Sequence, residues 1–419
     1  MDTRNSSGDY VYYGGFGEDY LASIFEQFKA KVYPRPYEYP IIVIYGLVFL
    51  LAILGNTLVC IAVLRNEHMR TVTNYYIVNL AVADILVSIV CLPITVVVDV
   101  SETWFFGDVL CSIIPYIQHT SVCVSIFTLT MIAVDRYLAI CRPLKFQISS
   151  KRTVITVIVI WVVSFVTMLP HSLSMATQSE PIMKAFLKPL WLTKCSDYKW
   201  KTSPWRMVYN VVTLLFTYLA PLCVIGVAYC MVCLRLWSGI PSDETSHKSS
   251  NNNTSGNGKS KRAPRVTNKS TEAQLQSRRK VARMLIVVVV LFALCYLPIR
   301  VMNVLDAFGM FSGDNVDMLK HGNTVAFVYL VSHIMAFFNS AINPVIYNFM
   351  SAKFRQAFKM AFSCCLPASQ RQSRYAKRYG YKCQSFMHST AVSDTRMSNT
   401  NTECISMTNR ANSVHIPDA

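Results

Sequence analysis

The chain has 419 residues, of which 53% are hydrophobic and 15% are charged, and its formal net charge is +17. A composition this apolar is solvated by lipid, which excludes a set of two or three soluble domains. The excess of basic residues suits a surface that faces anionic lipid and acidic partners, and nucleic-acid binding is the poorer interpretation.

Residues 1–40 form the first segment, and they lack an apolar stretch long enough for a cleavable signal peptide. The first membrane span is therefore expected to serve as the insertion signal. Asn5 begins an Asn-Ser-Ser glycosylation acceptor. Apolar residues at helical spacing before Pro34 predict an amphipathic helix over residues 21–32. Such a helix rests on lipid headgroups or covers a ligand, and the spacing alone does not choose between these roles.

Seven apolar stretches are long enough to cross a bilayer, for which about 20 residues are needed. An odd number of spans places the two termini on opposite sides of the membrane. Basic residues concentrate in the connections after spans one, three, five and seven. We therefore expect a multi-pass protein of the plasma membrane, with its amino terminus outside the cell. The predicted spans are residues 41–64, 75–98, 111–141, 154–173, 207–237, 282–304 and 324–347.

Polar side chains inside the spans are informative because each costs free energy in hydrocarbon. Antiparallel helices would bring those of spans one, two, three and seven to a similar depth, where they could form a hydrated pocket that suits a sodium ion. The sequence suggests no other metal ion and no cofactor. The polar set is Asn56, Asp84, Ser125, Asn339 and Asn343. Prolines that permit kinks inside the spans are Pro93, Pro170, Pro221, Pro298 and Pro344.

Asp135-Arg136-Tyr137 closes the cytoplasmic end of the third span, where Asp135 and Arg136 are almost the only charges of a long apolar run. An ionisable pair at the rim of the hydrocarbon is costly unless it has a function. Arg136 is expected to pair with Asp135 and hold this end closed, so that release of the guanidinium acts as a switch. The alternative is an arginine that only orients the helix.

The chain contains 14 cysteines, but this topology leaves only Cys111 and Cys195 outside the cell. They can meet if the connection after the fourth span folds back over the third, and an oxidising compartment would keep the bridge. Cys364 and Cys365 end an amphipathic segment, residues 351–365, that follows the seventh span. Their position predicts palmitoylation, and two unmodified thiols are the alternative.

Two segments rich in Ser, Asn and Thr cannot bury a core. They are residues 241–271, between spans five and six, and residues 366–419. We expect both to be disordered and cytoplasmic, on either side of a bundle that ends at residue 350. Clustered hydroxyls in the basic tail suit phosphorylation, and solvated disorder without regulation is the alternative.

Each span carries a short motif. The motifs are Gly55-Asn56, Asn79-Leu80-Ala81-Val82-Ala83-Asp84, Asp135-Arg136-Tyr137, Trp161, Pro221 with Tyr229, Phe292 with Cys295-Tyr296-Leu297-Pro298, and Asn343-Pro344-Val345-Ile346-Tyr347. In this order they resemble the rhodopsin-like G-protein-coupled receptors. The resemblance implies an all-α membrane protein, a seven-transmembrane helix bundle with a short amphipathic cytoplasmic helix after the seventh span. It also implies a heterotrimeric G protein, arrestin and receptor kinases as partners. The residues it assigns to the switch are Asp135, Arg136, Tyr137, Tyr229, Phe292, Tyr296, Asn343, Pro344 and Tyr347.

The ligand class is sought in the extracellular half of the bundle. Gln118 stands where aminergic receptors have an aspartate, and Phe337 stands where opsins have the Schiff-base lysine. Amines and retinal are therefore disfavoured. The mouth offers hydrogen bonds with few charges, which suits the amides of a peptide and an amidated carboxyl end. The predicted ligand-binding residues are Thr95, Asp99, Gln118, His119, His171, Asn303, His333 and Phe337.

Further motifs look like the orexin receptors and their invertebrate relatives, the allatotropin receptors. They include Arg70-Thr71-Val72-Thr73-Asn74-Tyr75, Cys91-Leu92-Pro93, Trp104-Phe105-Phe106-Gly107, Ile114-Pro115-Tyr116-Ile117-Gln118 and Phe362-Ser363-Cys364-Cys365-Leu366-Pro367. This resemblance implies a peptide ligand assisted by the helix over residues 21–32, and a G protein of the calcium-mobilising class. Tyr137 departs from it, because orexin receptors typically carry Trp there. An allatotropin-type or invertebrate orexin-type receptor is thus favoured, and the alternative is a receptor for another amidated neuropeptide.

Acidic residues of the outer face predict a ligand that carries positive charge. They are Asp99, Glu102, Asp108, Asp306, Asp314 and Asp317. A transporter could use the same kinked helices, but the sequence shows no internal repeat. It also shows no nucleophile, base or metal site of an enzyme.

Overall fold

The computed structural model describes residues 38–142, 150–179, 193–200, 204–237, 266–310 and 318–363, together with Glu26, Pro34 and Pro36. The chain divides into a unit of residues Met1–Phe358 and a unit of residues Lys359–Ala419, and the fold is described for the first. Several predictions lie outside the described residues. These concern Asn5, the helix over residues 21–32 apart from Glu26, the linker over residues 241–271 up to residue 265, Cys364, Cys365 and the tail. Residues 266–271 of that predicted linker are instead the start of a helix, Val266–Ala307, so the prediction of disorder was wrong for them.

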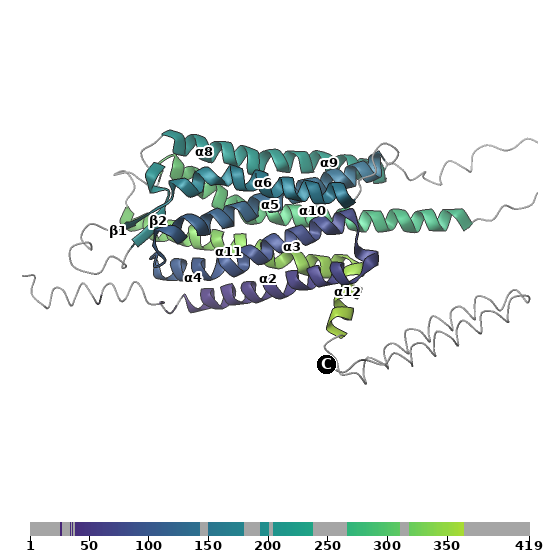
Figure 1. The fold of residues 1–419 in the computed structure, drawn as a ribbon, viewed down its shortest axis with the longest axis horizontal. Coiled ribbons are helices and arrows are strands. Elements are labelled where there is room, and N and C mark those ends of the chain that lie inside the picture. The colour runs from purple at the N-terminus through teal and green to yellow at the C-terminus, as the bar shows by residue number, and fades with distance from the viewer. Residues whose placement is uncertain are drawn as a thin grey trace, which may run out of the picture. The chain divides into compact units, whose positions relative to one another are not determined.

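Seven helical segments in these ranges are long and apolar enough to cross a membrane, which confirms the predicted fold (Figure 1). The spans are α2 (Tyr39–Arg65), α3 (Val72–Val90), α5 (Gly107–Cys141), α6 (Ser150–Ser174), α8 (Pro204–Leu214) with α9 (Ala220–Trp237), α10 (Val266–Ala307) and α11 (Met318–Met350). The shorter elements are the helices α4 (Leu92–Ser101) and α12 (Ala352–Ser363), the 3₁₀ turns Glu67–Met69 and Tyr198–Trp200, and the strands β1 (Ala176–Ser179) and β2 (Thr193–Ser196). Helix α5 contacts α3, α6, α9 and α10, so it is central to the bundle.

Two of the predicted prolines interrupt their spans. The second span ends as α3 at Val90 and resumes as α4 at Leu92, because Pro93 has no amide hydrogen and its ring displaces the carbonyl one turn earlier. In the fifth span a π-helical stretch, Leu215–Leu219, precedes Pro221. The wider turn accommodates the proline ring without ending the helix. By contrast, α6, α10 and α11 run continuously through Pro170, Pro298 and Pro344.

The first and seventh spans approach closely at Gly55. A Cβ atom added at this glycine would lie 2.8 Å from both Cβ and Cγ of Pro344. The absence of a side chain lets α2 contact α11, and it brings Asn56 Nδ2 within 2.9 Å of the carbonyl oxygen of Ser340. Gly55-Asn56 therefore works as one unit, in which the glycine permits the contact and the asparagine fixes it.

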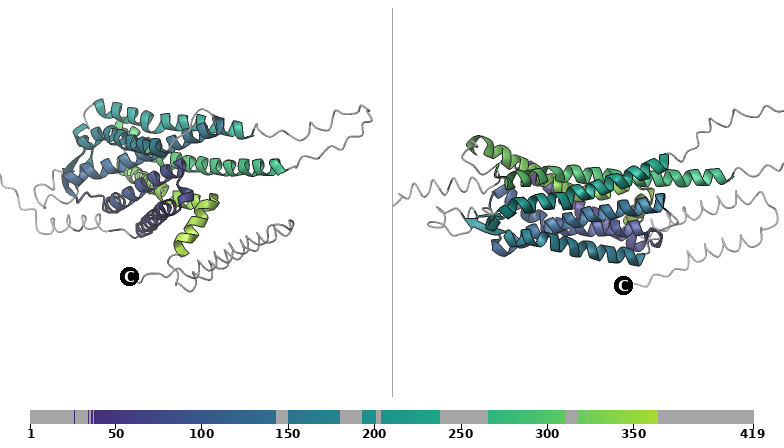
Figure 2. Two further views of the ribbon diagram at one scale, coloured as in Figure 1. Left: turned by 45° about the vertical axis from the view of Figure 1, so that its right-hand side comes forward. Right: turned by 90° about the horizontal axis from the view of Figure 1, so that it is seen from above.

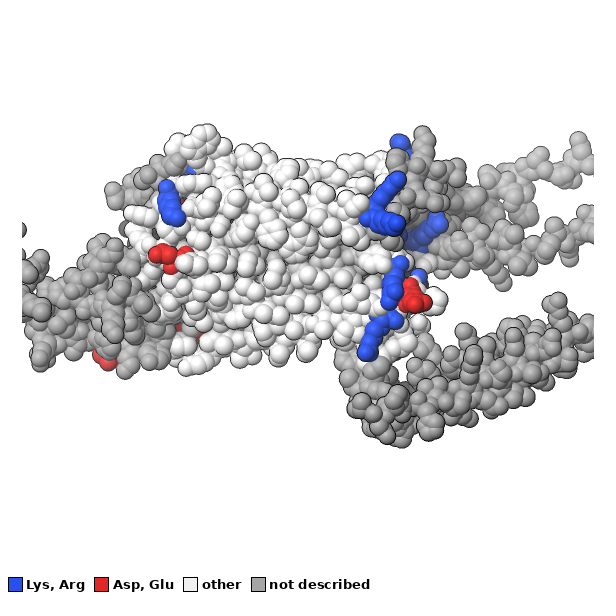
Figure 3. Space-filling model, in the orientation of Figure 1, with Lys and Arg blue, Asp and Glu red and all other residues white. Residues whose placement is uncertain are grey.

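The surface separates into an apolar band and charged ends. Exposed apolar side chains, such as Val154, Ile155 and Ile158 on α6, face outward along the spans. Figure 3 shows an uncharged band with most of the visible Lys and Arg at the end away from β1 and β2. This distribution matches a slab of hydrocarbon around the helices.

A β-hairpin covers one end of the bundle, opposite the end toward which α10 extends (Figure 2). Strand β2 pairs antiparallel with β1, and Thr177 lies opposite Cys195. A disulfide joins Cys195 to Cys111 near the start of α5, as predicted. We call the half of the bundle with this hairpin the hairpin half, and the half with Asp135-Arg136-Tyr137 the switch half.

The expected amphipathic helix after the seventh span is present as α12. Its side chains Phe354, Ala357 and Phe358 are buried in the main core cluster. The ring of Phe354 stacks on Tyr347 of α11, with 5.4 Å between centroids. These contacts place the start of α12 against the switch half.

Candidate functional site

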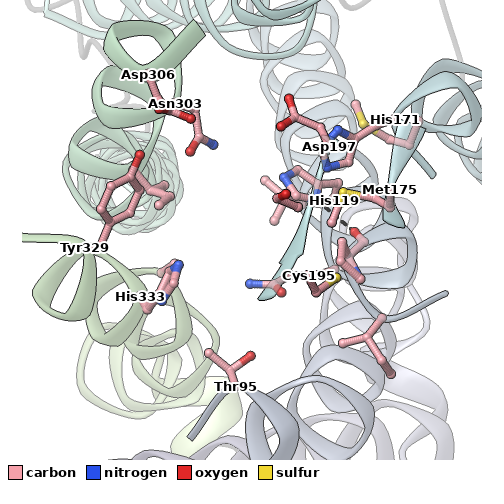
Figure 4. Close-up of a pocket in the computed structure, with 18 of the residues that line it drawn as sticks. Thr95, His119, His171, Met175, Cys195, Asp197, Asn303, Asp306, Tyr329 and His333 are labelled. Carbon is pink, nitrogen blue, oxygen red and sulfur yellow. Dashed lines mark hydrogen bonds between the residues drawn. The ribbon is translucent and has the colours of Figure 1, made fainter. Parts of the chain in front are cut away.

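A cavity of about 360 Å³ opens in the hairpin half, between α4, α5, α6, β2, α8, α10 and α11. Figure 4 shows side chains from opposite walls that point into it. Seven of the predicted ligand-binding residues line this cavity. They are Thr95, Asp99, Gln118, His119, His171, Asn303 and His333. The sequence thus located the cavity and a part of its polar lining, which also includes residues such as Tyr209, Asn210 and Tyr329.

Phe337 is not among the lining residues. Its side chain is 2% exposed, and its ring packs edge-on against Tyr45 of α2, with 6.3 Å between centroids. The lining residue of that turn is Ala336, because successive helical positions point about 100° apart. The structure therefore places Phe337 in the contact between the first and seventh spans.

In one wall of the cavity, Asp99 on α4 joins neighbouring helices through its carboxylate. Its carboxylate accepts a hydrogen bond from the Tyr45 hydroxyl at 2.6 Å and lies 3.0 Å from His333 Nδ1. These contacts connect spans one, two and seven. Asp99 is thus engaged on both oxygens, which leaves it less available to a cationic ligand than the sequence suggested.

The opposite wall contains an imidazole pair. The rings of His119 and His171 lie 4.6 Å apart, and Tyr209 stacks on His171 at 6.3 Å. Since a carbonyl only accepts, His119 Nδ1 must donate the 2.7 Å hydrogen bond to Pro115. Its Nε2 is then an acceptor in the neutral ring. This wall offers flat surfaces and hydrogen-bonding nitrogens that suit amides and aromatic side chains.

An ion-pair cluster at the rim was missed by the sequence reasoning. Arg206 at the start of α8 lies 2.6 Å from Asp197 after β2 and 2.5 Å from Asp306 near the end of α10. It also donates to the backbone carbonyl of Asp306 at 3.0 Å. The available signal was an arginine at the outer edge of a predicted span, but nothing in the sequence identified its partners. The acidic Asp306 is consequently paired within the protein.

Arg300 on α10 also lines the cavity and was also missed. A charge inside the sixth predicted span was the signal, since intramembrane charges are rare and mark functional sites.

Of the other outer acidic residues, Asp108 accepts hydrogen bonds from the backbone and hydroxyl of Thr177. Asp314 and Asp317 lie outside the described residues.

A second polar cluster lies deeper, around Asp84 on α3. The side chain is 2% exposed and accepts a hydrogen bond from Asn343 Nδ2 at 3.0 Å. The amide oxygens of Asn56, Asn339 and Asn343 are buried and meet no donor among the described residues. Ser125, by contrast, donates to its own helix at Ser121. A buried carboxylate beside unpaired oxygens fits a hard cation such as sodium, which prefers oxygen ligands.

The switch half holds the Asp135-Arg136 pair. Asp135 Oδ2 accepts from Arg136 at 2.5 Å and from the Thr73 hydroxyl at 3.0 Å. Tyr229 is 5% exposed, and its hydroxyl has no hydrogen-bond partner in the described part of the chain. Tyr137 packs against the main core cluster. Arg136 is thus held by its neighbour in the chain, and Tyr229 offers an unoccupied polar group.

The two halves meet at aromatic residues of α10. Tyr296 lines the cavity, and its ring lies 4.7 Å from Phe292, one turn closer to the switch half. Tyr218 of the π-helical stretch donates to the carbonyl of Ala293 at 2.6 Å. Spans five and six are therefore joined where the predicted switch aromatics lie.

Comparison with known proteins adds two findings. Residues 55–347 match the sequence profile of the family described as "7 transmembrane receptor (rhodopsin family)". Neuropeptide FF receptor 2 of Mus musculus is similar to this chain, with 32% identity over 342 residues. The matched region covers 80% of this chain and 75% of that protein.

Proposed function

The chain belongs to the rhodopsin family of seven-transmembrane receptors, and on that premise we propose that it is activated by an amidated neuropeptide that enters the cavity of the hairpin half. Membership of this family makes it a G-protein-coupled receptor and not an enzyme. The similarity to neuropeptide FF receptor 2 supports a receptor of the neuropeptide type. In the proposed topology the hairpin half is extracellular and the switch half is cytoplasmic, because the basic helix ends lie on the switch side.

The observation that carries the peptide proposal is the cavity itself. It is lined by hydrogen-bonding side chains from both walls, among them Gln118, Asn303 and His333. Such groups suit the many amides of a peptide. The absence of an amine-pairing carboxylate at Gln118 and of a lysine at Phe337 supports this choice over an amine or retinal.

Two peptide families are candidates. The motifs quoted above favour an orexin-type or allatotropin-type peptide. The similarity to neuropeptide FF receptor 2 supports the receptor class and makes neuropeptide FF a second candidate, but it does not select the peptide. We propose the allatotropin-type peptide first and neuropeptide FF second.

A peptide panel tests this proposal. Cells expressing the full chain are exposed to amidated peptides of the allatotropin, orexin and neuropeptide FF types, each beside its free-acid counterpart. We expect a calcium rise with at least one amidated peptide, a weaker response to its free acid, and none in mock-transfected cells. Silence toward every peptide, together with a response to an amine or a lipid, contradicts the proposal.

The proposed signalling step follows from the switch half. When agonist repacks Tyr296 and Phe292, Arg136 leaves Asp135 and turns toward the Tyr229 hydroxyl, which has no hydrogen-bond partner among the described residues. This movement opens a site for a heterotrimeric G protein. Tyr347 and Asn343-Pro344 move with α11. A sodium ion held by Asp84 and the amide oxygens of Asn339 and Asn343 would add positive charge between spans two and seven. It would therefore oppose the movement of α11. Palmitoylation at Cys364 and Cys365, glycosylation at Asn5 and a tail read by arrestin and kinases remain parts of the proposal.

A further inference from the structure

Arg300 is a cation in the wall of the ligand cavity. It lies on α10, six residues before Asp306 and four after Tyr296, and all three residues line the cavity. Six helical residues correspond to a rise of about 9 Å, so Arg300 lies well below Asp306, toward the middle of the span. A cation at this depth in a membrane helix needs a partner or a function.

In the described part of the chain, the Arg300 guanidinium forms neither an ion pair nor a hydrogen bond; the ion pairs found there belong to Arg136, Arg206 and His333. Titratable groups near enough to act on its charge include Cys123, Tyr296, Tyr209 and Tyr218. None of these is a carboxylate. The imidazoles of His119 and His171 also interact electrostatically with Arg300, but an imidazole supplies no negative charge.

The carboxylates that line the cavity are engaged elsewhere. Asp99 is held by Tyr45 and His333. Asp197 and Asp306 share the single guanidinium of Arg206. Among the residues that the structure describes, the cavity therefore has a positive charge at depth that no carboxylate compensates, and near its rim two carboxylates face one arginine. A partly desolvated charge without a partner is costly to the free protein.

We propose that Arg300 receives a carboxylate of the ligand. This inference rests on the proposed peptide-receptor function. It deepens that function by stating which end of the ligand carries an acidic residue and which end carries any basic residue. An amidated peptide has no terminal carboxylate, so the acid is an Asp or Glu side chain in the segment that enters most deeply. Any basic residue of the peptide lies outward, near Asp197 and Asp306. The planar guanidinium binds a carboxylate through two parallel hydrogen bonds, which lysine cannot reproduce.

Matched peptide libraries test the inference on the purified full-length receptor. Three libraries of amidated hexapeptides differ only in one fixed residue, which is Glu, Gln or Lys. Binding is measured by thermal stabilisation and by activation of a co-purified G protein. The variants are Arg300→Gln and Arg300→Glu, and Arg142→Gln is the control because it makes the same change at an exposed arginine outside the cavity, just past the end of α5.

We expect the wild-type receptor to favour the Glu library over the Gln library by about 10- to 100-fold in affinity, as for a hydrogen bond between charged groups. Arg300→Gln abolishes that preference, Arg300→Glu transfers it to the Lys library, and Arg142→Gln retains it. Without any peptide, Arg300→Gln raises the melting temperature by about 2 °C, because it removes an unpaired charge. A purely structural arginine would give a fall instead.

Several results overturn the inference. Equal affinity for the Glu and Gln libraries, or an unchanged preference in Arg300→Gln, refutes the carboxylate partner while leaving a peptide receptor in place. A lower melting temperature for peptide-free Arg300→Gln also refutes it. If the Glu library binds preferentially but no library activates the G protein, the proposed function fails and the anion site stands. If no library binds at all, both fail.

Discussion

The hairpin half and the switch half use charged residues differently. In the hairpin half, ion pairs join segments far apart in the sequence: Arg206 to Asp306 across 100 residues, and His333 to Asp99 across 234. In the switch half, Arg136 pairs with Asp135, its immediate neighbour. Long-range pairs fix the positions of helices, whereas a pair within one helix can open without separating any two.

This difference explains how one bundle can both hold a ligand cavity and change shape. Pairs such as Arg206 with Asp197 and Asp306 act on the relative positions of β2, α8 and α10, so they maintain the cavity. The Asp135-Arg136 pair controls only where one guanidinium points. Among the described residues, Asp135 also accepts a hydrogen bond from outside its helix, from the Thr73 hydroxyl at 3.0 Å. Changes to the first group should alter stability, and changes to the second should alter signalling.

The largest expected effect is that of Arg136→Ala. It should abolish agonist-induced G-protein activation, because Arg136 is the group that leaves Asp135 for the G protein. The melting temperature should also fall, because the Asp135 carboxylate, which is 6% exposed, loses its cation and keeps the Thr73 hydroxyl as a partner. Activation is measured by nucleotide exchange with the peptide found active in the panel. Arg142→Ala, an exposed arginine just past the end of α5, is the control and should signal normally. Normal signalling by Arg136→Ala contradicts the proposed switch.

Arg206→Gln should produce the largest loss of stability among the hairpin-half variants. It leaves Asp197 and Asp306 without their shared cation, and breaking a buried pair costs about 3–5 kcal/mol. We expect about 2 kcal/mol, because the three side chains are 14%, 16% and 32% exposed. Thermal unfolding in detergent measures this.

The control for that prediction is the triple variant Arg206→Gln, Asp197→Asn, Asp306→Asn. It removes all three charges, so part of the lost stability should return. If the triple variant is less stable than Arg206→Gln alone, the penalty does not come from unpaired carboxylates.

The contrast between the halves also decides what the sequence could predict. Spans and their order depend on local hydropathy, so the seven helices could be predicted from the sequence. The interruption at Pro93 could be predicted from the proline itself. The Asp135-Arg136 pair was predictable because its members are adjacent. The disulfide between Cys111 and Cys195 was predictable because topology left those two cysteines on the same side.

The hairpin-half contacts were less accessible. Arg206 could pair with any of several acidic residues, and only the folded chain selects Asp197 and Asp306. The unpaired state of Arg300 depends on where every carboxylate lies, which no local pattern records. Phe337 shows that the side-chain direction of a single position was also hard to predict. Adjacent positions on a helix face different directions, so Ala336 lines the cavity while Phe337 lies in the contact between α2 and α11.

Gly55→Ala tests a contact that lies between the two halves. The new Cβ would lie 2.8 Å from Cβ and Cγ of Pro344, so the helices must separate, at a cost of about 1–3 kcal/mol. Gly46→Ala on the same helix is the matched control. A Cβ there meets nothing within 4 Å, and alanine favours a helix by up to about 1 kcal/mol over glycine. Thermal unfolding should therefore shift in opposite directions, and equal shifts would show that α2 and α11 do not touch at Gly55.

The smallest effects distinguish the halves most directly. Tyr45→Phe removes a hydrogen bond to Asp99 at 2.6 Å, and Tyr218→Phe removes one to the carbonyl of Ala293 at 2.6 Å. Each should cost about 1 kcal/mol of stability, but the functional consequences should differ. Asp99 lines the cavity, so Tyr45→Phe should weaken agonist binding and leave peptide-free signalling unchanged. Tyr218 joins spans five and six beside Phe292, so Tyr218→Phe should change peptide-free signalling and leave agonist binding nearly intact. Agonist affinity and basal nucleotide exchange, measured on both variants, separate these outcomes. Equal changes in affinity would mean that the two halves are not independent.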